Sequence, residues 1–258
     1  MATRVKRSNP TVIYLYGVTQ KIAKDLGHTV GIDGASVVES LPLSGLTCWI
    51  SRVSRTDFAD QLQRNMENLD WLANATIHHQ RVVSTIAQVA DVLPARFATV
   101  FLNELSLAED LESRKRILRA DLKRIKNSDE WGIKVFRVQE KPEWPSTRTP
   151  VRTGKEYLKA KAVLLQRRPD QTSDSDIERF AGALKRIAVK TAEVGKVSGG
   201  QRGLQWQTSL LLRRADRRKL ETLLKKFSEE WANRRQIEAS GPWPPYSFVS
   251  RETAGTSA

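Results

Sequence analysis

Apolar and polar residues alternate in several short stretches of the chain, and apolar residues recur every three or four positions in the longer stretches between them. The first pattern is typical of strands and the second of helices with one apolar stripe. The short stretches predict strands at Thr11–Val18, Ala35–Leu41, Leu46–Val53, Phe97–Phe101, Trp131–Val138 and Leu204–Leu212. The longer stretches predict helices at Phe58–Met66, Trp71–Ala90, Ser106–Lys126, Thr153–Arg168, Ser175–Val194 and Asp216–Arg234.

Polar residues at the ends of these stretches predict where two of the helices begin. Asp70 is placed to cap the helix that follows it, because its side chain can accept hydrogen bonds from the first free N–H groups. Ser106, with Glu109 three residues later, has the spacing of a capping box for the next helix. Asp91–Pro94 interrupts the helical pattern between them, so we expect the earlier helix to end there.

The order of the elements predicts an α+β protein of two domains. Residues 11–128 contain three early strands followed by helices and form the expected first domain. Residues 129–249 follow a modified ferredoxin-like β-α-β-β-α-β arrangement in which the first helix is split. The second strand of that arrangement would lie near Val194–Ser198, and the proline-containing Glu140–Pro150 would be a loop or linker.

Basic residues outnumber acidic ones, with 43 Lys and Arg against 29 Asp and Glu in 258 residues, which gives a formal net charge of +14. Such an excess favours anionic partners, and a basic nucleic-acid-binding regulatory protein is the alternative function that it suggests. The excess is spread along the chain, without a helix-turn-helix or RNA-recognition motif, which disfavours that alternative. Residues 1–10, which are basic, and residues 250–258, which are polar, are expected to be flexible tails.

The sequence offers little that could support catalysis or metal binding. His78 and His79 are adjacent, so on a helix they point about 100° apart and do not easily share a metal ion. His28 and Cys48 are the remaining histidine and the single cysteine, too few for a typical zinc site. Neither a phosphate-binding Gly-rich loop nor a nucleophile elbow is present. We therefore expect no metal, no cofactor and no enzymatic activity.

Apolar runs in the chain are too short to cross a bilayer, which needs ~20 residues. The basic N-terminus is not followed by an apolar segment of the secretory type. A single cysteine also excludes a disulfide within one chain, as suits a reducing compartment. These features predict a cytoplasmic protein without membrane insertion.

Gly241–Phe248, with the sequence Gly-Pro-Trp-Pro-Pro-Tyr-Ser-Phe, is the most unusual local feature. Its three prolines restrict the backbone and remove three N–H donors, so its aromatic residues would project from a stiff segment. One interpretation is a strap that seals an apolar groove of its own domain. The other is a preformed surface for a partner chain, because a stiff segment loses little entropy on binding. The residues of the segment leave both interpretations open.

The same segment resembles the C-terminal hallmark of the GvpF/GvpL family of gas vesicle proteins, and other segments match that family in the same order. These segments are Tyr14–Gly17, Trp71-Leu72 with His78-His79 and Val82-Val83, Leu93–Phe101, Glu130–Val135, and Gly154 with Tyr157-Leu158. Together the matches span roughly residues 12–249. Ala98 stands where the family usually has Gly, and Asp170–Val194 matches no recognisable pattern.

The resemblance implies a two-domain α+β protein with a ferredoxin-like second domain and no catalytic residues. It also implies an accessory protein of gas vesicle assembly, located in the cytoplasm and at the gas vesicle, that binds the small hydrophobic shell protein and other accessory proteins. The candidate partner-binding residues are Arg96, Trp243, Pro244, Pro245, Tyr246 and Phe248. Arg96 would either make an ionic contact with a partner or hold its own loop to Glu130 or another carboxylate.

Overall fold

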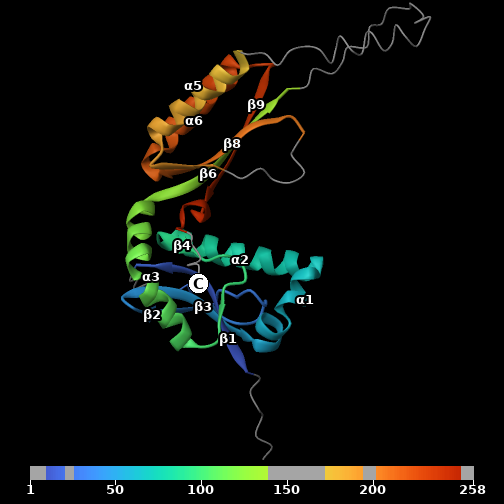
Figure 1. The fold of residues 1–258 in the computed structure, drawn as a ribbon, viewed down its shortest axis with the longest axis vertical. Helices are drawn as coiled ribbons and strands as arrows, with labels where there is room; N and C mark the ends of the chain where they lie inside the picture. Colours follow the sequence, from blue (N-terminus) through green and yellow to red (C-terminus); the bar gives the residue numbers. More distant parts are fainter. Residues whose placement is uncertain (1–9, 21–25, 139–171, 194–201, 251–258) are drawn as a thin grey trace, which may run out of the picture.

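The computed structural model describes residues 10–20, 26–138, 172–193 and 202–250, which contain two antiparallel sheets covered by helices (Figure 1). The predicted α+β class is confirmed. Outside the described residues lie the predicted helix Thr153–Arg168, the loop Glu140–Pro150, the strand near Val194–Ser198, and all but one residue of each predicted tail.

The first sheet lies between two helices. Its strand order is β2-β3-β1-β4, and β5 also pairs with β1. The strands are β1 (Thr11–Thr19), β2 (Glu39–Leu43), β3 (Leu46–Ser54), β4 (Val92–Pro94) and β5 (Val100–Phe101). β1 is buried on both faces because both of its alternating sets of residues are apolar or aromatic. Ile13 and Leu15 pack toward α3 (Glu104–Ile125), whereas Val12 and Tyr14 pack toward α2 (Leu69–Val89).

The approach to α2 differs from the prediction. The expected helix at Phe58–Met66 is divided into η1 (Thr56–Asp60), a π-helical turn, and the short α1 (Leu62–Glu67). α2 is capped by Asn68, whose side chain accepts hydrogen bonds from the N–H groups of Asp70 and Trp71. The prediction of Asp70 as the cap is therefore wrong, because the chain already turns into the helix before it.

The interruption of the helix predicted at Asp91–Pro94 is confirmed, because α2 ends at Val89, but the elements that follow it differ from the prediction. Asp91–Pro94 contains strand β4, which pairs with the end of β1, and only the last two residues of the expected strand Phe97–Phe101 form β5. α3 begins after Asn103, whose side chain accepts the N–H of Ser106 at 2.9 Å. The Ser106 hydroxyl accepts the N–H of Asn103 at 3.3 Å, so Ser106 completes a capping box from inside the helix instead of starting it.

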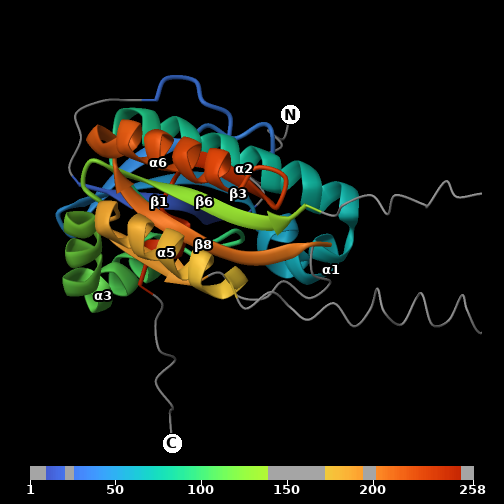
Figure 2. The same ribbon diagram turned by 90° about the horizontal axis from the view of Figure 1, so that it is seen from above.

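The second sheet has the strand order β7-β8-β6-β9, with every neighbouring pair antiparallel. Its strands are β6 (Ser128–Arg137), β7 (Lys190–Glu193), β8 (Leu204–Arg213) and β9 (Arg235–Trp243). α5 (Thr172–Ile187) and α6 (Arg217–Glu230) lie side by side over one face, with the 3-10 turn η2 (Arg214–Asp216) before α6 (Figure 2). The core between them contains Ile133, Val135, Phe180, Ala183, Leu184, Leu210, Leu212, Leu220, Phe227 and Trp231.

The helix expected at Ser175–Val194 is shorter than predicted. It ends at Ile187, and Lys190–Glu193 forms the edge strand β7 beside β8. Thr191, which was expected on the inner face of the helix, instead pairs with Leu210 across the sheet. The helical spacing of apolar residues continues beyond Ile187. The periodicity alone therefore did not show where the helix ends and the strand begins.

Ala98, in the loop between β4 and β5, has a φ angle of +64°. A side chain in this left-handed region costs about 1–2 kcal/mol relative to the usual helical region, so glycine would be less strained at this position. The N–H of Ala98 donates to the Tyr14 hydroxyl at 3.0 Å, which holds the loop against β1. The residue is thus kept in a strained conformation by its neighbours.

We expect Ala98→Gly to raise the free energy of unfolding by up to about 1 kcal/mol, because relief of the strain exceeds the added flexibility of the unfolded chain. Ala120→Gly is the matched control, since Ala120 is exposed within α3, where glycine should lower stability by about 1 kcal/mol. Urea unfolding followed by circular dichroism would measure both. Equal destabilisation by the two changes would contradict the prediction.

Candidate functional site: the C-terminal clasp

β9 is irregular at Gly241, where the register shifts between the pairs Gly132–Ser240 and Glu130–Trp243, and it leaves the second sheet after Trp243. Gly241 has a φ angle of +139°, and a Cβ atom there would lie 2.8 Å from the carbonyl oxygen of Glu130 and 3.1 Å from the Trp131 ring. Glycine is therefore required at this close approach. The irregular pairing redirects the chain. Residues 244–250, called here the C-terminal clasp, lie between the second sheet and the first half of the chain (red in Figure 1).

The Glu130 carboxylate connects the clasp to β6. Glu130 is only 8% exposed, and a buried carboxylate is tolerated only where donors satisfy its oxygens. Ser247 supplies two of them: its N–H donates to Oε2 at 2.8 Å and its hydroxyl donates to Oε1 at 2.5 Å. The carboxylate of Glu130, near the start of β6, thus receives hydrogen bonds from the clasp.

A second buried carboxylate, that of Asp121 on α3, connects the clasp to the first half. Asp121 is 1% exposed and accepts the N–H of Ser250 at 2.7 Å and its hydroxyl at 2.8 Å. Arg124, one turn further along α3, forms an ion pair with the same carboxylate. The Arg124 guanidinium also donates to the carbonyl oxygen of Phe248 at 2.6 Å. Charge-assisted bonds of this kind are among the stronger ones in proteins.

Phe248 provides the apolar contact of the clasp. It is 2% exposed and lies in the cluster between α3 and the first sheet. Leu211 of β8 belongs to the same cluster, so one core contains residues from both halves of the chain. The clasp therefore does not seal a groove within its own half, as one interpretation of the sequence expected, but packs into the first half.

Tyr246 joins the clasp to α2 through His79. The Tyr246 hydroxyl lies 3.2 Å from His79 Nε2, and the Tyr14 hydroxyl lies 2.9 Å from Nδ1. The Tyr14 hydroxyl also accepts the N–H of Ala98, so His79 is held between two tyrosine hydroxyls, one of which is fixed by the loop before β5. Burial lowers the pKa of His79 from 6.5 to about 4, although a hydrogen bond to the backbone of Ala95 opposes the shift. His79 is thus neutral at pH 7.

The predicted partner-binding residues differ in solvent exposure. Pro244, Pro245 and Phe248 are buried, and Tyr246 is largely buried. Trp243 is 46% exposed, and Arg96 is exposed at the start of the loop that precedes β5. Within the described residues Arg96 forms no salt bridge, and the oxygens of Glu130 are occupied by Ser247.

Trp243 lies at a groove of about 590 Å³ between the end of α2 and the start of the clasp. The lining residues are Ser84, Ala87, Gln88, Val89, Ala90, Asp91, Asn127, Asp129, Arg214, Pro242, Trp243 and Pro244. Arg214 forms ion pairs with Asp91 at 3.1 Å and with Asp129 at 3.0 Å, and so connects the two halves at the edge of the groove. The groove combines an exposed aromatic side chain, small apolar residues and a fixed charged edge.

The structure also bears on metal binding, thiol reactivity and membrane insertion in the described part of the chain. That part contains no group of three or more His, Cys, Asp or Glu side chains that could hold a metal ion. Cys48 is buried, and burial raises the pKa of its thiol to about 12, so it is a poor nucleophile. Among the described helices, none is both long and apolar enough to span a membrane.

Sequence reasoning missed the polar residues of the clasp. Ser247 lies within the unusual segment, but nothing in its neighbours indicates that it binds Glu130. Asp121 did carry a signal, because it falls among the inward-facing leucines of α3, and a polar residue on an apolar stripe needs a partner. The identity of that partner, 129 residues away in Ser250, could not be read from the spacing.

Comparisons of the sequence and of the structure with known proteins all find gas vesicle proteins. The family model described as gas vesicle synthesis protein GvpL/GvpF matches residues 12–250. Gas vesicle protein L of Streptomyces sp. (strain CB03234) is 28% identical over 251 residues, which cover 92% of this chain and 92% of that protein.

Two crystal structures have a similar fold. The gas vesicle protein GvpF from Anabaena sp. PCC7120 superposes with a TM-score of 0.68 at 18% identity, covering 93% of this chain and 97% of that one. GvpF from Microcystis aeruginosa gives a TM-score of 0.63, also at 18% identity, covering 93% and 99%. The similarity of fold therefore extends over most of the chain.

We expect Phe248→Ala to lower the free energy of unfolding by about 3–5 kcal/mol, because it removes a buried ring from the core shared by both halves. Leu105→Ala is the control, since Leu105 is 68% exposed and should change stability by less than about 0.5 kcal/mol. Chemical unfolding would measure both variants. A loss below about 1 kcal/mol for Phe248→Ala would show that the clasp contributes little.

The lowered pKa of His79 predicts a pH-dependent stability. Between pH 6.5 and about 4 the unfolded state binds a proton that the folded state does not, so stability falls as the pH is lowered through this range. The full loss of stability, reached once the pH lies below both pKa values, is about 3 kcal/mol. His79→Gln should reduce the difference in unfolding free energy between the two ends of this range. His28→Gln, at an exposed position, should leave it unchanged. An unchanged difference in the His79 variant would contradict the prediction.

Proposed function

The chain belongs to the GvpL/GvpF family of gas vesicle synthesis proteins, and we propose that it acts as a non-enzymatic accessory protein that binds the gas vesicle shell protein. The observation that carries the proposal is the family match over residues 12–250, which includes the whole clasp. Other accessory proteins of the vesicle are proposed as further partners. We infer that it works in the cytoplasm and at the growing vesicle, where these partners would be found.

A physical reason supports such a role. A small shell protein that polymerises through apolar surfaces and strand edges is prone to premature aggregation. A partner that offers a limited apolar surface can cover those features until the subunit is added to the shell. The groove at Trp243 has the size and composition for such a contact.

We propose that Trp243 is the central contact residue for the shell protein. Large aromatic side chains in grooves contribute much of the binding energy at protein interfaces, especially when they are held rigidly. Pro244 and Pro245, which are buried directly after it, and Phe248 in the core would hold Trp243 in place. Arg96 is the second exposed candidate and would supply an ionic contact.

We also infer that residues 11–128 and 129–249 form two domains, the second ferredoxin-like. The succession β6, α5, β7, β8, α6, β9, with the antiparallel order β7-β8-β6-β9, supports this inference. The clasp would then be a contact between domains that belongs by sequence to the second and by packing to the first.

Co-purification with the co-expressed shell protein would test the proposed contact. We expect the tagged wild type to retain the shell protein and Trp243→Ala to retain at least about tenfold less, because truncation of such an anchor costs about 2 kcal/mol or more. Arg96→Ala should weaken retention less. Leu69→Ala is the matched control, because Leu69 is 79% exposed and lies away from the groove at the start of α2.

The outcomes separate the parts of the proposal, provided that circular dichroism shows each variant to be folded. If Trp243→Ala retains as much shell protein as Leu69→Ala, the contact lies elsewhere on the molecule. If the wild type retains none, direct binding of the shell protein is wrong for this chain.

A further inference from the structure

A second groove, on the opposite face of the second sheet from the clasp, runs between α5 and α6. It has a volume of about 650 Å³. Its lining residues are Arg179, Ala183, Arg186, Ile187, Arg218, Lys219, Thr222, Leu223, Lys226 and Phe227. The apolar members form the floor and five basic residues form the two walls, so an apolar strip is enclosed by positive charge. No residue of this groove lines the groove at Trp243.

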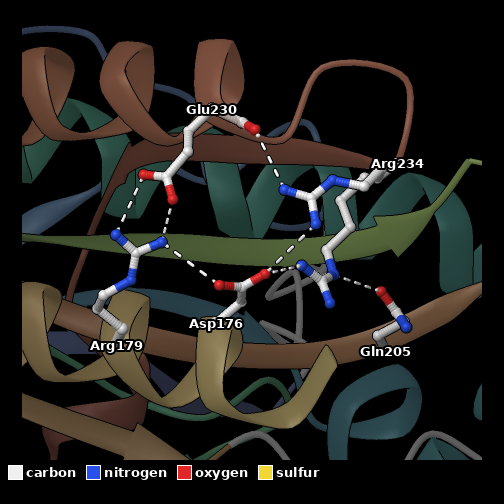
Figure 3. A network of polar contacts seen from close by, with 6 residues as sticks. Asp176, Arg179, Gln205, Glu230 and Arg234 are labelled. Atoms are coloured by element: carbon white, nitrogen blue, oxygen red, sulfur yellow. Dashed lines mark hydrogen bonds and ion pairs between the residues drawn. The ribbon is translucent and has the colours of Figure 1, made fainter. Parts of the chain in front are cut away.

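The two helices that form the walls are held together by a network of polar contacts at one end (Figure 3). Arg179 of α5 makes paired contacts with the Glu230 carboxylate of α6, one of them at 3.2 Å, and lies 3.4 Å from Asp176. Asp176 also forms ion pairs with Arg234 and Arg235 at the start of β9. Paired guanidinium–carboxylate contacts have a defined geometry, so they restrain the relative position of α5 and α6 at this end of the groove.

Several basic residues of the walls have no salt bridge within the described residues. Lys219 is paired with Asp216, and Arg179 with Glu230. In contrast, Arg186, Arg218 and Lys226 are exposed and have no salt-bridge partner in the described part of the chain. Three unpaired cations around an apolar floor favour an occupant that carries both apolar groups and negative charge.

We propose that this groove binds an amphipathic helix of a partner protein, with an apolar stripe flanked by Asp or Glu. The lining spans nine residues along α5 and ten along α6, about 12–14 Å, which matches apolar residues at positions i, i+3 or i+4, and i+7 of a helix. Acidic residues on both sides of that stripe would face the two basic walls.

Other occupants fit the groove less well. Residues 139–171 of this chain contain eight Lys or Arg against four Asp or Glu, so the walls would repel them. A second copy of the chain carries the same net charge of +14. A nucleic-acid backbone would leave the apolar floor without a partner, and a bilayer surface does not enter a concave strip between two helices.

The test uses a fluorescent peptide of about 18 residues, long enough for five helical turns, with Leu along one face and Glu on both sides of it. Fluorescence anisotropy would measure its affinity for the full-length protein. We expect binding that weakens at least about fivefold between low and high salt, as for contacts of exposed charges. A peptide of the same composition, rearranged so that the Leu residues do not share a face, should bind at least about tenfold more weakly.

Variants locate the site. Replacing Arg186, Arg218 and Lys226 together by Glu should weaken peptide binding at least about tenfold, because attraction becomes repulsion. The matched control replaces Arg116 and Lys123 on α3 and Lys126 directly after it by Glu, which changes the net charge equally at three exposed positions without a salt bridge in the described residues. It should lower affinity by less than about threefold, since the charges are distant from the groove. Unfolding curves would verify that both variants are folded.

Several results would overturn the proposal. Equal weakening by the two triple variants would mean that only the total charge matters. Equal binding of the rearranged peptide would mean that no helical face is recognised. The proposal also fails if vesicles of phosphatidylserine and phosphatidylcholine, or duplex DNA, bind through the groove residues while the peptide does not. A change of molar mass in light scattering caused only by the groove variant would identify a second copy as the occupant instead.

Discussion

The carboxylates of Asp121 and Glu130 lie buried where the two halves of the chain meet, and residues 247–250 bring them hydrogen-bond donors. Burial of a carboxylate without hydrogen-bond donors costs free energy, so these contacts favour a single position of residues 247–250. The same segment adds Phe248 to a core that also contains Leu211 of the second sheet. The core between the first sheet and α3 is therefore complete only with the clasp, which lies more than 100 residues later in the sequence. Contacts of such separation are entropically costly to form, and the buried ring and charge-assisted bonds offset that cost.

This arrangement determines which residues of the Gly-Pro-Trp-Pro-Pro-Tyr-Ser-Phe segment are available to other proteins. The segment is a strap, but it packs into the first half of the chain and not into a groove of its own half. The second interpretation, a partner surface, is our proposal for Trp243. Its last residues connect the halves, while Trp243 remains half exposed beside a groove at their junction. Because the residues after Trp243 are buried, the aromatic ring is carried on a rigid support, and little conformational entropy would be lost on binding.

The structure shows where the basic residues that give the net charge of +14 lie. Many basic residues are paired with carboxylates, as Arg214 is with Asp91 and Asp129. A local excess remains at the walls of the groove between α5 and α6, where it encloses apolar residues. Two proposed surfaces of different chemistry thus lie on opposite faces of the second sheet, one aromatic and one basic and apolar. A protein that brings several partners together could use both.

The sequence by itself determined the α+β class, most strand and helix centres and the family, because apolar periodicity and the Gly-Pro-Trp-Pro-Pro-Tyr-Ser-Phe segment are local properties. It did not determine helix ends such as Asn103 and Ile187, because a cap at the first and the pairing of strand β7 after the second interrupt a periodic pattern that continues past them. Only the tertiary structure decided that Ser247 satisfies Glu130, that Ser250 satisfies Asp121 and that Tyr246 meets His79. Each of these contacts joins residues 100 or more positions apart, and their pairing depends on how the two sheets are placed in space.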